Sequence, residues 1–173
     1  IMIYITQQSM FVGELDIILS DNCAPDERLQ YFIEKYEPQI LRKILGQKFF
    51  NSLQTELNSG LTGEWAVLVN GGNFLIDGVA YQFEGLKNIT AGFIYYWYHR
   101  DNAYNVAQTG GTLPMRTEAT NKSMAFKQFT AWNKAVELID CGDYSLKSFL
   151  KNSSLEDYEV NLYGLKIKGL QWL

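Results

Sequence analysis

The tripeptide His99-Arg100-Asp101 spells part of the catalytic loop of protein kinases. The rest of that signature is missing, because the chain has no Gly-rich loop, no strand-lysine motif and no Asp-Phe-Gly. A histidine and an arginine also suit the carboxyl end of a helix, where the helix dipole favours cations. The tripeptide therefore predicts a polar helix end.

Two other strings resemble ligand-binding loops only in part. Asp140-Cys141-Gly142-Asp143 lacks the ligand count of a calcium loop, and no Cys or His partner has zinc spacing. Its glycine predicts a helix-ending turn instead. Gly110-Gly111-Thr112 has no Walker lysine after it and no strand before it, so it predicts a plain loop.

Glu34 and Glu37 are three residues apart, a spacing that places two carboxylates on one helix face for acid–base work. A solvated helix face is the favoured interpretation, because Glu is seldom buried. The sequence thus predicts no catalytic, cofactor-binding or metal-binding residue.

Composition narrows the class of protein. The chain has 173 residues, of which 47% are hydrophobic and 20% charged, which is typical of one folded domain. A net charge of −4 without a long basic run argues against a dedicated nucleic-acid surface. No stretch has the length of a membrane span or the pattern of a signal peptide. We therefore expect Cys23 and Cys141 to be free thiols in a reducing compartment.

The spacing of apolar residues predicts a mainly α fold. Ile1, Ile3 and Ile5 alternate as in a strand, and a helical face then runs from about residue 26 to Gly46. Pro38 lies inside that face and predicts a kink or two short helices. A further helix is expected at about 48–58.

A small β-hairpin is predicted as an insertion near residues 65–83. Asp77-Gly78 suits a type I′ turn between the apolar segments 74–76 and 79–83. The segment 65–69 is also apolar and is followed by a dense Asn-Gly-Gly turn signal.

The next predicted helix, about 84–100, is apolar nearly all round. Such a helix is either central or shared with a neighbouring subunit. Its surplus tyrosines, Tyr95, Tyr96 and Tyr98, are therefore interface candidates, since Tyr is enriched in interfaces. A long polar loop is expected at 102–120, then helices at about 121–140 and 144–151.

The last segment, 156–173, predicts an extended, strand-like tail beyond a helical domain of residues 1–155. Its apolar residues alternate, and the apolar side changes after Gly164 and again after Gly169. Such a tail can add a strand to a neighbour. Its interface candidates are Tyr158, Val160, Leu162, Ile167 and Trp172.

Several strings together carry a family resemblance over about residues 29–140. They are Tyr31 to Pro38 and on to Gly46, Trp65 to Gly72, Tyr81 to Lys87, Tyr95 to Tyr98, Asn121-Lys122-Ser123 and Trp132-Asn133. In these the chain resembles head–tail connector proteins (adaptor or head-completion proteins) of tailed phages and prophages of Bacteroidetes-type hosts. The hairpin is more elaborate than in the smallest adaptors, and the tail is a further departure.

The resemblance implies a structural virion protein without enzymatic activity. It implies a homo-oligomeric ring in the virion neck that contacts portal and tail proteins, assembled in the host cytoplasm. DNA would pass through the ring without specific binding, and no membrane would be involved. Adaptors of this kind project loops or tails onto neighbouring subunits.

Two other interpretations remain open. One is a small binding module or enzyme with an aromatic pocket between helices and hairpin, lined by Trp65, Tyr81 and Trp97. The other is a different virion part, such as a tail terminator or a capsid-stabilising protein.

Overall fold

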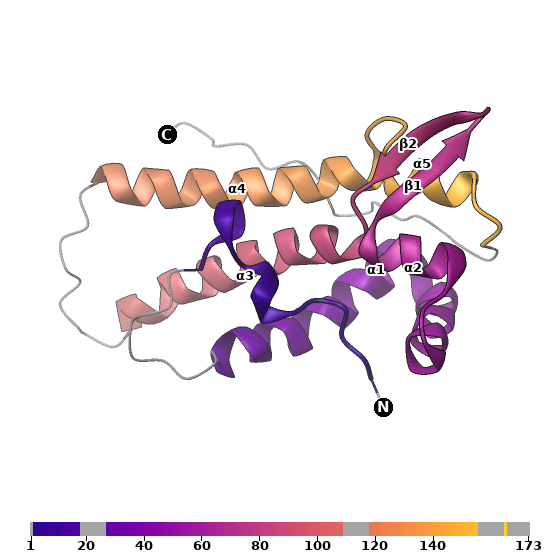
Figure 1. Cartoon of the computed structure of the whole chain (residues 1–173). Coiled ribbons are helices and arrows are strands. Elements are labelled where there is room, and N and C mark those ends of the chain that lie inside the picture. Colours follow the sequence, from indigo (N-terminus) through magenta and orange to yellow (C-terminus); the bar gives the residue numbers. More distant parts are fainter. Residues whose placement is uncertain (1, 18–26, 109–117, 156–164, 166–173) are drawn as a thin grey trace.

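Three long helices make up most of the fold: α1 (Glu27–Ser59), α3 (Leu86–Gln108) and α4 (Glu118–Asp140). In this computed structural model α3 lies between α1 and α4 and packs against both (Figure 1). The structure describes residues 2–17, 27–108, 118–155 and 165, and gives only the backbone at 102–108 and 118–125. The prediction of a mainly helical chain with a small hairpin is confirmed.

Helix α1 consists of two helical parts that meet at Gly46. The backbone there has φ 75° and ψ 163°, angles that are essentially confined to glycine. The predicted division into helices before and after Gly46 is therefore confirmed. Of the two outcomes predicted at Pro38, a kink or two short helices, the second is wrong, because α1 continues through the proline. Buried residues on both sides of it, among them Ile33 and Leu41, hold the helix in the core against the cost of the lost hydrogen bond.

The predicted insertion at 65–83 contains a helix as well as a hairpin. Residues Gly63–Asn70 form α2, and the hairpin follows as β1 (Gly72–Ile76) and β2 (Val79–Phe83). The strands are antiparallel and pair Ile76 with Val79 across the Asp77-Gly78 turn. The four apolar residues at 66–69 lie in α2 because Leu68 and Val69 pack into the helical core, which a short apolar run does not reveal.

The N-terminal segment is not a strand, contrary to the alternation of its isoleucines. It is extended at first and then forms two short 3₁₀ helices, Gln8–Met10 and Gly13–Leu15. Figure 1 shows it crossing α3 toward α4. Its hydrogen bonds go to side chains of α1: Gln54 binds both backbone groups of Ile3, with its Oε1 3.0 Å from the amide nitrogen and its Nε2 2.9 Å from the carbonyl oxygen.

The predicted loop at 102–120 is too long. Helix α3 extends to Gln108 and α4 already begins at Glu118, so both helices run into the expected loop. Polar side chains, which led to the loop prediction, are compatible with the solvated part of a long helix. The short last helix, α5 (Leu146–Lys151), was predicted, and Ser145 caps its first turn.

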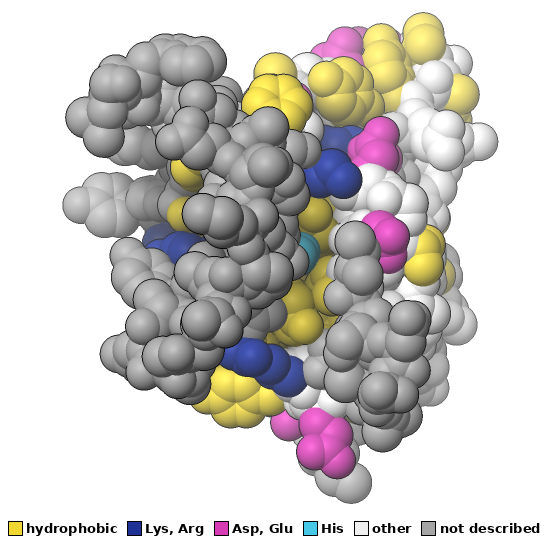
Figure 2. Space-filling model, turned by 90° about the vertical axis from the view of Figure 1, so that its left-hand side faces the viewer, with side chains coloured by type: hydrophobic (Ala, Val, Ile, Leu, Met, Phe, Trp, Pro, Cys, Tyr) yellow, Lys and Arg dark blue, Asp and Glu magenta, His cyan; other side chains and the backbone are white. Residues whose placement is uncertain are grey.

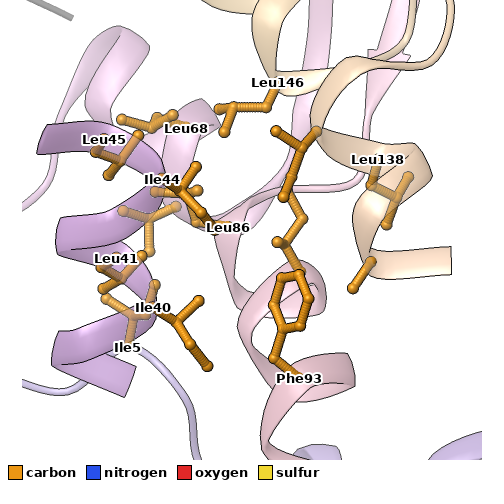
Figure 3. Close-up of a cluster of buried hydrophobic side chains, with 14 of the residues drawn as sticks. Ile5, Ile40, Leu41, Ile44, Leu45, Leu68, Leu86, Phe93, Leu138 and Leu146 are labelled. Carbon is orange, nitrogen blue, oxygen red and sulfur yellow. The ribbon is translucent and has the colours of Figure 1, made fainter. Parts of the chain in front are cut away.

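The core consists of two clusters of buried side chains, the larger of which draws residues from nearly every element. Figure 3 shows Ile40, Ile44 and Leu45 of α1 facing Leu86 and Phe93 of α3, with Leu138 and Leu146 closing the far side. Gly92 brings α3 close to α4, because a Cβ there would lie 2.9 Å from the carbonyl oxygen of Ala131. None of the helices that the structure describes has the length and apolar character needed to cross a membrane.

Candidate functional site

The predicted interface tyrosines of α3 are buried inside the chain. Tyr95 and Tyr98 pack with Phe32 and Leu29 of α1, and Tyr96 contacts Trp132 of α4. Their rings therefore do not form a surface for a partner. The all-round apolar pattern of this helix has its physical cause in the fold, since α3 is covered by α1, α4 and the N-terminal segment.

The predicted interface residues of the tail, Tyr158, Val160, Leu162, Ile167 and Trp172, lie outside the described residues. Leu165 is described, and it is buried in the main core cluster.

The His99-Arg100-Asp101 tripeptide lies inside α3 rather than at its end. The imidazole ring of His99 packs between the rings of Tyr95 and Tyr98, and Asp101 accepts a hydrogen bond from the hydroxyl of Tyr36 at 3.0 Å. The prediction of a helix end was wrong, because the helix continues to Gln108.

The Asp140-Cys141-Gly142-Asp143 string is the helix-ending turn that the sequence predicts. Helix α4 ends at Asp140, and Gly142 has a φ of 78°. The thiol of Cys141 is free and exposed. Among the described residues, no group of three or more His, Cys, Asp or Glu side chains is placed so that it could hold a metal ion. Gly110-Gly111-Thr112 and Cys23 lie outside the described residues.

The side chains of Glu34 and Glu37 lie on different faces of α1, and of these two only Glu34 is exposed to solvent. Glu37 is buried, and its two carboxylate oxygens accept hydrogen bonds from the backbone amides of Ile5 at 2.7 Å and Thr6 at 2.8 Å. The prediction of a solvated face was therefore wrong for Glu37. The periodicity of α1 contained the signal, since Glu37 is four residues before Leu41 and four after Ile33 on the apolar side.

Burial raises the pKa of the Glu37 carboxyl above its ordinary value of 4.5, and the hydrogen bonds from Thr6 and Ile5 oppose the rise. The hydroxyl oxygens of Thr6 and Thr90 lie 2.7 Å apart and extend this buried polar cluster to α3. The cluster fastens the N-terminal segment between α1 and α3.

The aromatic residues of the alternative pocket are not gathered in one place. Trp65 packs on Phe49, Tyr81 lies beside Phe74 on the hairpin, and Trp97 stacks on Tyr36 with 5.2 Å between ring centroids. The sequence-predicted pocket is therefore not formed by these three residues.

A different groove, which the sequence reasoning missed, lies along α3 and α4 beside the N-terminal segment. It has a volume of about 430 Å³. Its walls come from three parts of the chain. They are Met10, Val12, Glu14 and Leu15 of the N-terminal segment, Glu84 just before α3 with Asn88 and Gly92 at the start of α3, and residues of α4 between Phe126 and Leu138. No sequence signal marks it, because its walls come from segments up to more than 100 residues apart.

The mouth of this groove is both apolar and charged. Val12 is 66% exposed and Phe126 is 59% exposed, which are high values for large hydrophobic side chains. Lys134 lies 3.9 Å from Glu14 across the groove, and Lys127 is exposed at the Phe126 end. Glu84 and Leu138 line it too.

The hairpin carries the second exposed apolar surface. At its base Phe83 stacks on Phe149 with 5.3 Å between centroids, and Phe74 meets the same ring edge-on. Beyond that anchor the hairpin projects past the helices (Figure 1), where Leu75 is 63% and Val79 is 55% exposed. We use "hairpin tip" for residues Leu75 to Val79.

A cluster of cations and aromatic rings lies where α1 meets the second half of α3. The guanidinium of Arg100 lies 4.1 Å from the ring centre of Trp97, and the amine of Lys35 lies 5.0 Å from that of Tyr36. Figure 2 views the molecule from this side and shows hydrophobic side chains next to Lys and Arg side chains. Each contact is made within one helix, Arg100 with Trp97 on α3 and Lys35 with Tyr36 on α1.

Searches against protein-family models, curated protein sequences and solved structures find no match to this chain.

Proposed function

We propose that the protein is a structural assembly subunit, a head–tail adaptor that forms a homo-oligomeric ring in the neck of a tailed phage or prophage virion. The observation that carries the proposal is the projecting hairpin, whose tip exposes Leu75 and Val79 beyond the helical body. These two exposed side chains lie on one projecting element, where a neighbouring protein can cover both.

The sequence resemblance supplies the identity of the assembly. It contributes the neck location, the portal and tail proteins as partners, and the passage of DNA through the lumen. The acidic chain is compatible with that passage, because a net charge of −4 does not attract a polyanion.

Native mass spectrometry of the purified protein over a range of concentrations tests the proposal, together with negative-stain images of the same sample. The expected result is a ring of a single size. The measurement is repeated with the portal protein from the same genome, because an adaptor can require its portal in order to assemble. A monomer in both conditions would overturn the proposal.

A further inference from the structure

Two exposed apolar surfaces lie on different parts of the molecule, and they differ in shape. The hairpin tip projects from the helical body (Figure 1). The groove between α3, α4 and the N-terminal segment is concave. Two such surfaces on one chain can meet between copies either reciprocally, in a twofold dimer, or head to tail, and the proposed ring requires the head-to-tail contact. Repetition of that contact closes a ring when the rotation between copies divides a full turn.

We infer that the hairpin tip of one copy inserts into the α3–α4 groove of the next copy. The inference rests on the proposed function, because it names the contact that joins neighbouring subunits of the ring. It assigns Leu75 and Val79 as the inserted side chains and Val12, Phe126 and Lys127 as the residues that receive them.

Charge is the first argument for this occupant. Asp77 is the only charged residue of the hairpin tip, and it lies in the turn between the two strands. Lys127 lies at the Phe126 end of the groove. Neither has an ion-pair partner among the described residues. Docking therefore brings an unpaired carboxylate to an unpaired amine at the rim, which favours one orientation of the hairpin.

Size is the second argument. The groove extends along α4 from Phe126 to Leu138, about 18 Å at 1.5 Å per residue. The volume of about 430 Å³ is enough for several aliphatic side chains but not for a whole hairpin, so the tip fills it while the base stays anchored on Phe149.

The hairpin's own anchoring is the third argument. The base is fixed by Phe74 and Phe83, so the tip is held away from the body at no further entropic cost. A preorganised projection of this kind binds better than a mobile loop of the same composition.

A complementation experiment tests the inference. One variant carries Leu75→Ser and Val79→Ser in the hairpin tip, and the other carries Thr130→Trp and Lys127→Glu in the groove. These side chains are exposed, so both variants are expected to keep the wild-type circular dichroism spectrum. Each variant alone is expected to self-associate at least about tenfold more weakly than the wild type in native mass spectrometry and sedimentation.

Mixing the two variants gives the decisive readout. The intact hairpin of the groove variant fits the intact groove of the hairpin variant, so a one-to-one heterodimer is expected and no larger species. Restored heterodimer formation supports the inference. If the hairpin variant is monomeric but mixing restores nothing, the hairpin contacts a surface other than this groove, and the groove assignment is overturned.

Two matched controls separate specific from general effects. Tyr144→Ser removes an exposed aromatic ring outside both surfaces, and Lys43→Glu reverses an exposed charge on α1. Both are expected to assemble as the wild type does. Assembly that is unchanged in the hairpin and groove variants overturns this inference and leaves the proposed ring intact, whereas a wild type that never associates, even with portal protein, overturns both.

Discussion

Glu37 is the residue whose chemistry the fold changes most. A carboxylate is normally kept in water, yet this one is buried and binds two backbone amides of the N-terminal segment. A buried charge with strong donors is tolerated because the hydrogen bonds replace those of water. The residue thereby satisfies the amides of Ile5 and Thr6, which form no strand within the described part of the chain.

The raised pKa of Glu37 predicts a pH-dependent stability. The folded state binds the proton more tightly than the unfolded state, so the wild-type free energy of unfolding should fall as the pH rises from 4.5 through the folded pKa. Above the folded pKa this contribution should be constant. Glu37→Gln has no titrating group at this position. The free energy of unfolding of the wild type minus that of the variant should therefore decrease as the pH rises over that window.

Urea unfolding of both proteins at a series of pH values measures this difference. Glu34→Gln is the matched control, because it removes a carboxylate one turn earlier on the exposed face of α1. A difference that increases with pH over the window would mean that the hydrogen bonds outweigh burial. At all pH values Glu37→Gln should also lose about 1–3 kcal/mol, because Ile5 and Thr6 donate to different oxygens of Glu37 and the glutamine nitrogen that replaces one of them cannot accept.

At the scale of elements, a single backbone position decides the course of α1. The helix turns at Gly46, where a left-handed φ combines with an extended ψ. A Cβ at this position would have no atom within 4 Å, so space is available and the backbone alone restricts the residue. Proline disfavours a helix interior more than any other residue, yet α1 continues through Pro38. The residues before and after Pro38 are buried in the core and keep this part of the helix in place.

Substitution at Gly46 should therefore destabilise the fold through backbone strain. Gly46→Ala is expected to cost about 1–3 kcal/mol. Gly46→Asn should cost about as much, because asparagine tolerates the ordinary left-handed region but not an extended ψ at positive φ. Chemical denaturation measures both. Lys43→Ala, on the exposed face of the same helix, should stay within about 0.5 kcal/mol of the wild type, and a neutral Gly46→Ala would contradict the strain.

At the scale of the whole molecule, the N-terminal segment joins the two core clusters. Ile5 belongs to the larger cluster, and Phe11 and Ile17 belong to the one formed with α1 and α3. The segment also supplies one wall of the groove. Its contacts are therefore needed both for stability and for the shape of the surface to which we assign the neighbouring hairpin.

Substitutions at the adjacent residues Phe11 and Val12 test the role in stability and the role in the groove separately. Phe11 is 5% exposed and Val12 is 66% exposed, so Phe11→Ala should cost about 3–5 kcal/mol and Val12→Ala about 0.5 kcal/mol or less. Thermal and urea unfolding measure the two costs. Equal losses would show that the segment does not pack as described. Val12→Ala should instead weaken self-association, which native mass spectrometry reads separately.

Much of the secondary structure was predictable from local patterns. The helical spacing of apolar residues, the Asp77-Gly78 turn, Gly46 and Gly142 are local features, and the structure has helices, a hairpin and helix ends at those positions. The candidate site was not predictable in the same way. The groove depends on which helices lie side by side, and the burial of Tyr95, Tyr96 and Tyr98 depends on what covers α3.

The sequence by itself determined a mainly helical chain with one hairpin, because periodicity and turn chemistry act over a few residues. Only the tertiary structure decided that Glu37 is buried, that Ile3 and Ile5 do not form a strand, and that Leu75 and Val79 remain exposed while the tyrosines of α3 do not. The physical reason is that an apolar side chain has the same preference for burial everywhere. Which apolar side chains are actually buried depends on contacts between residues far apart in the chain.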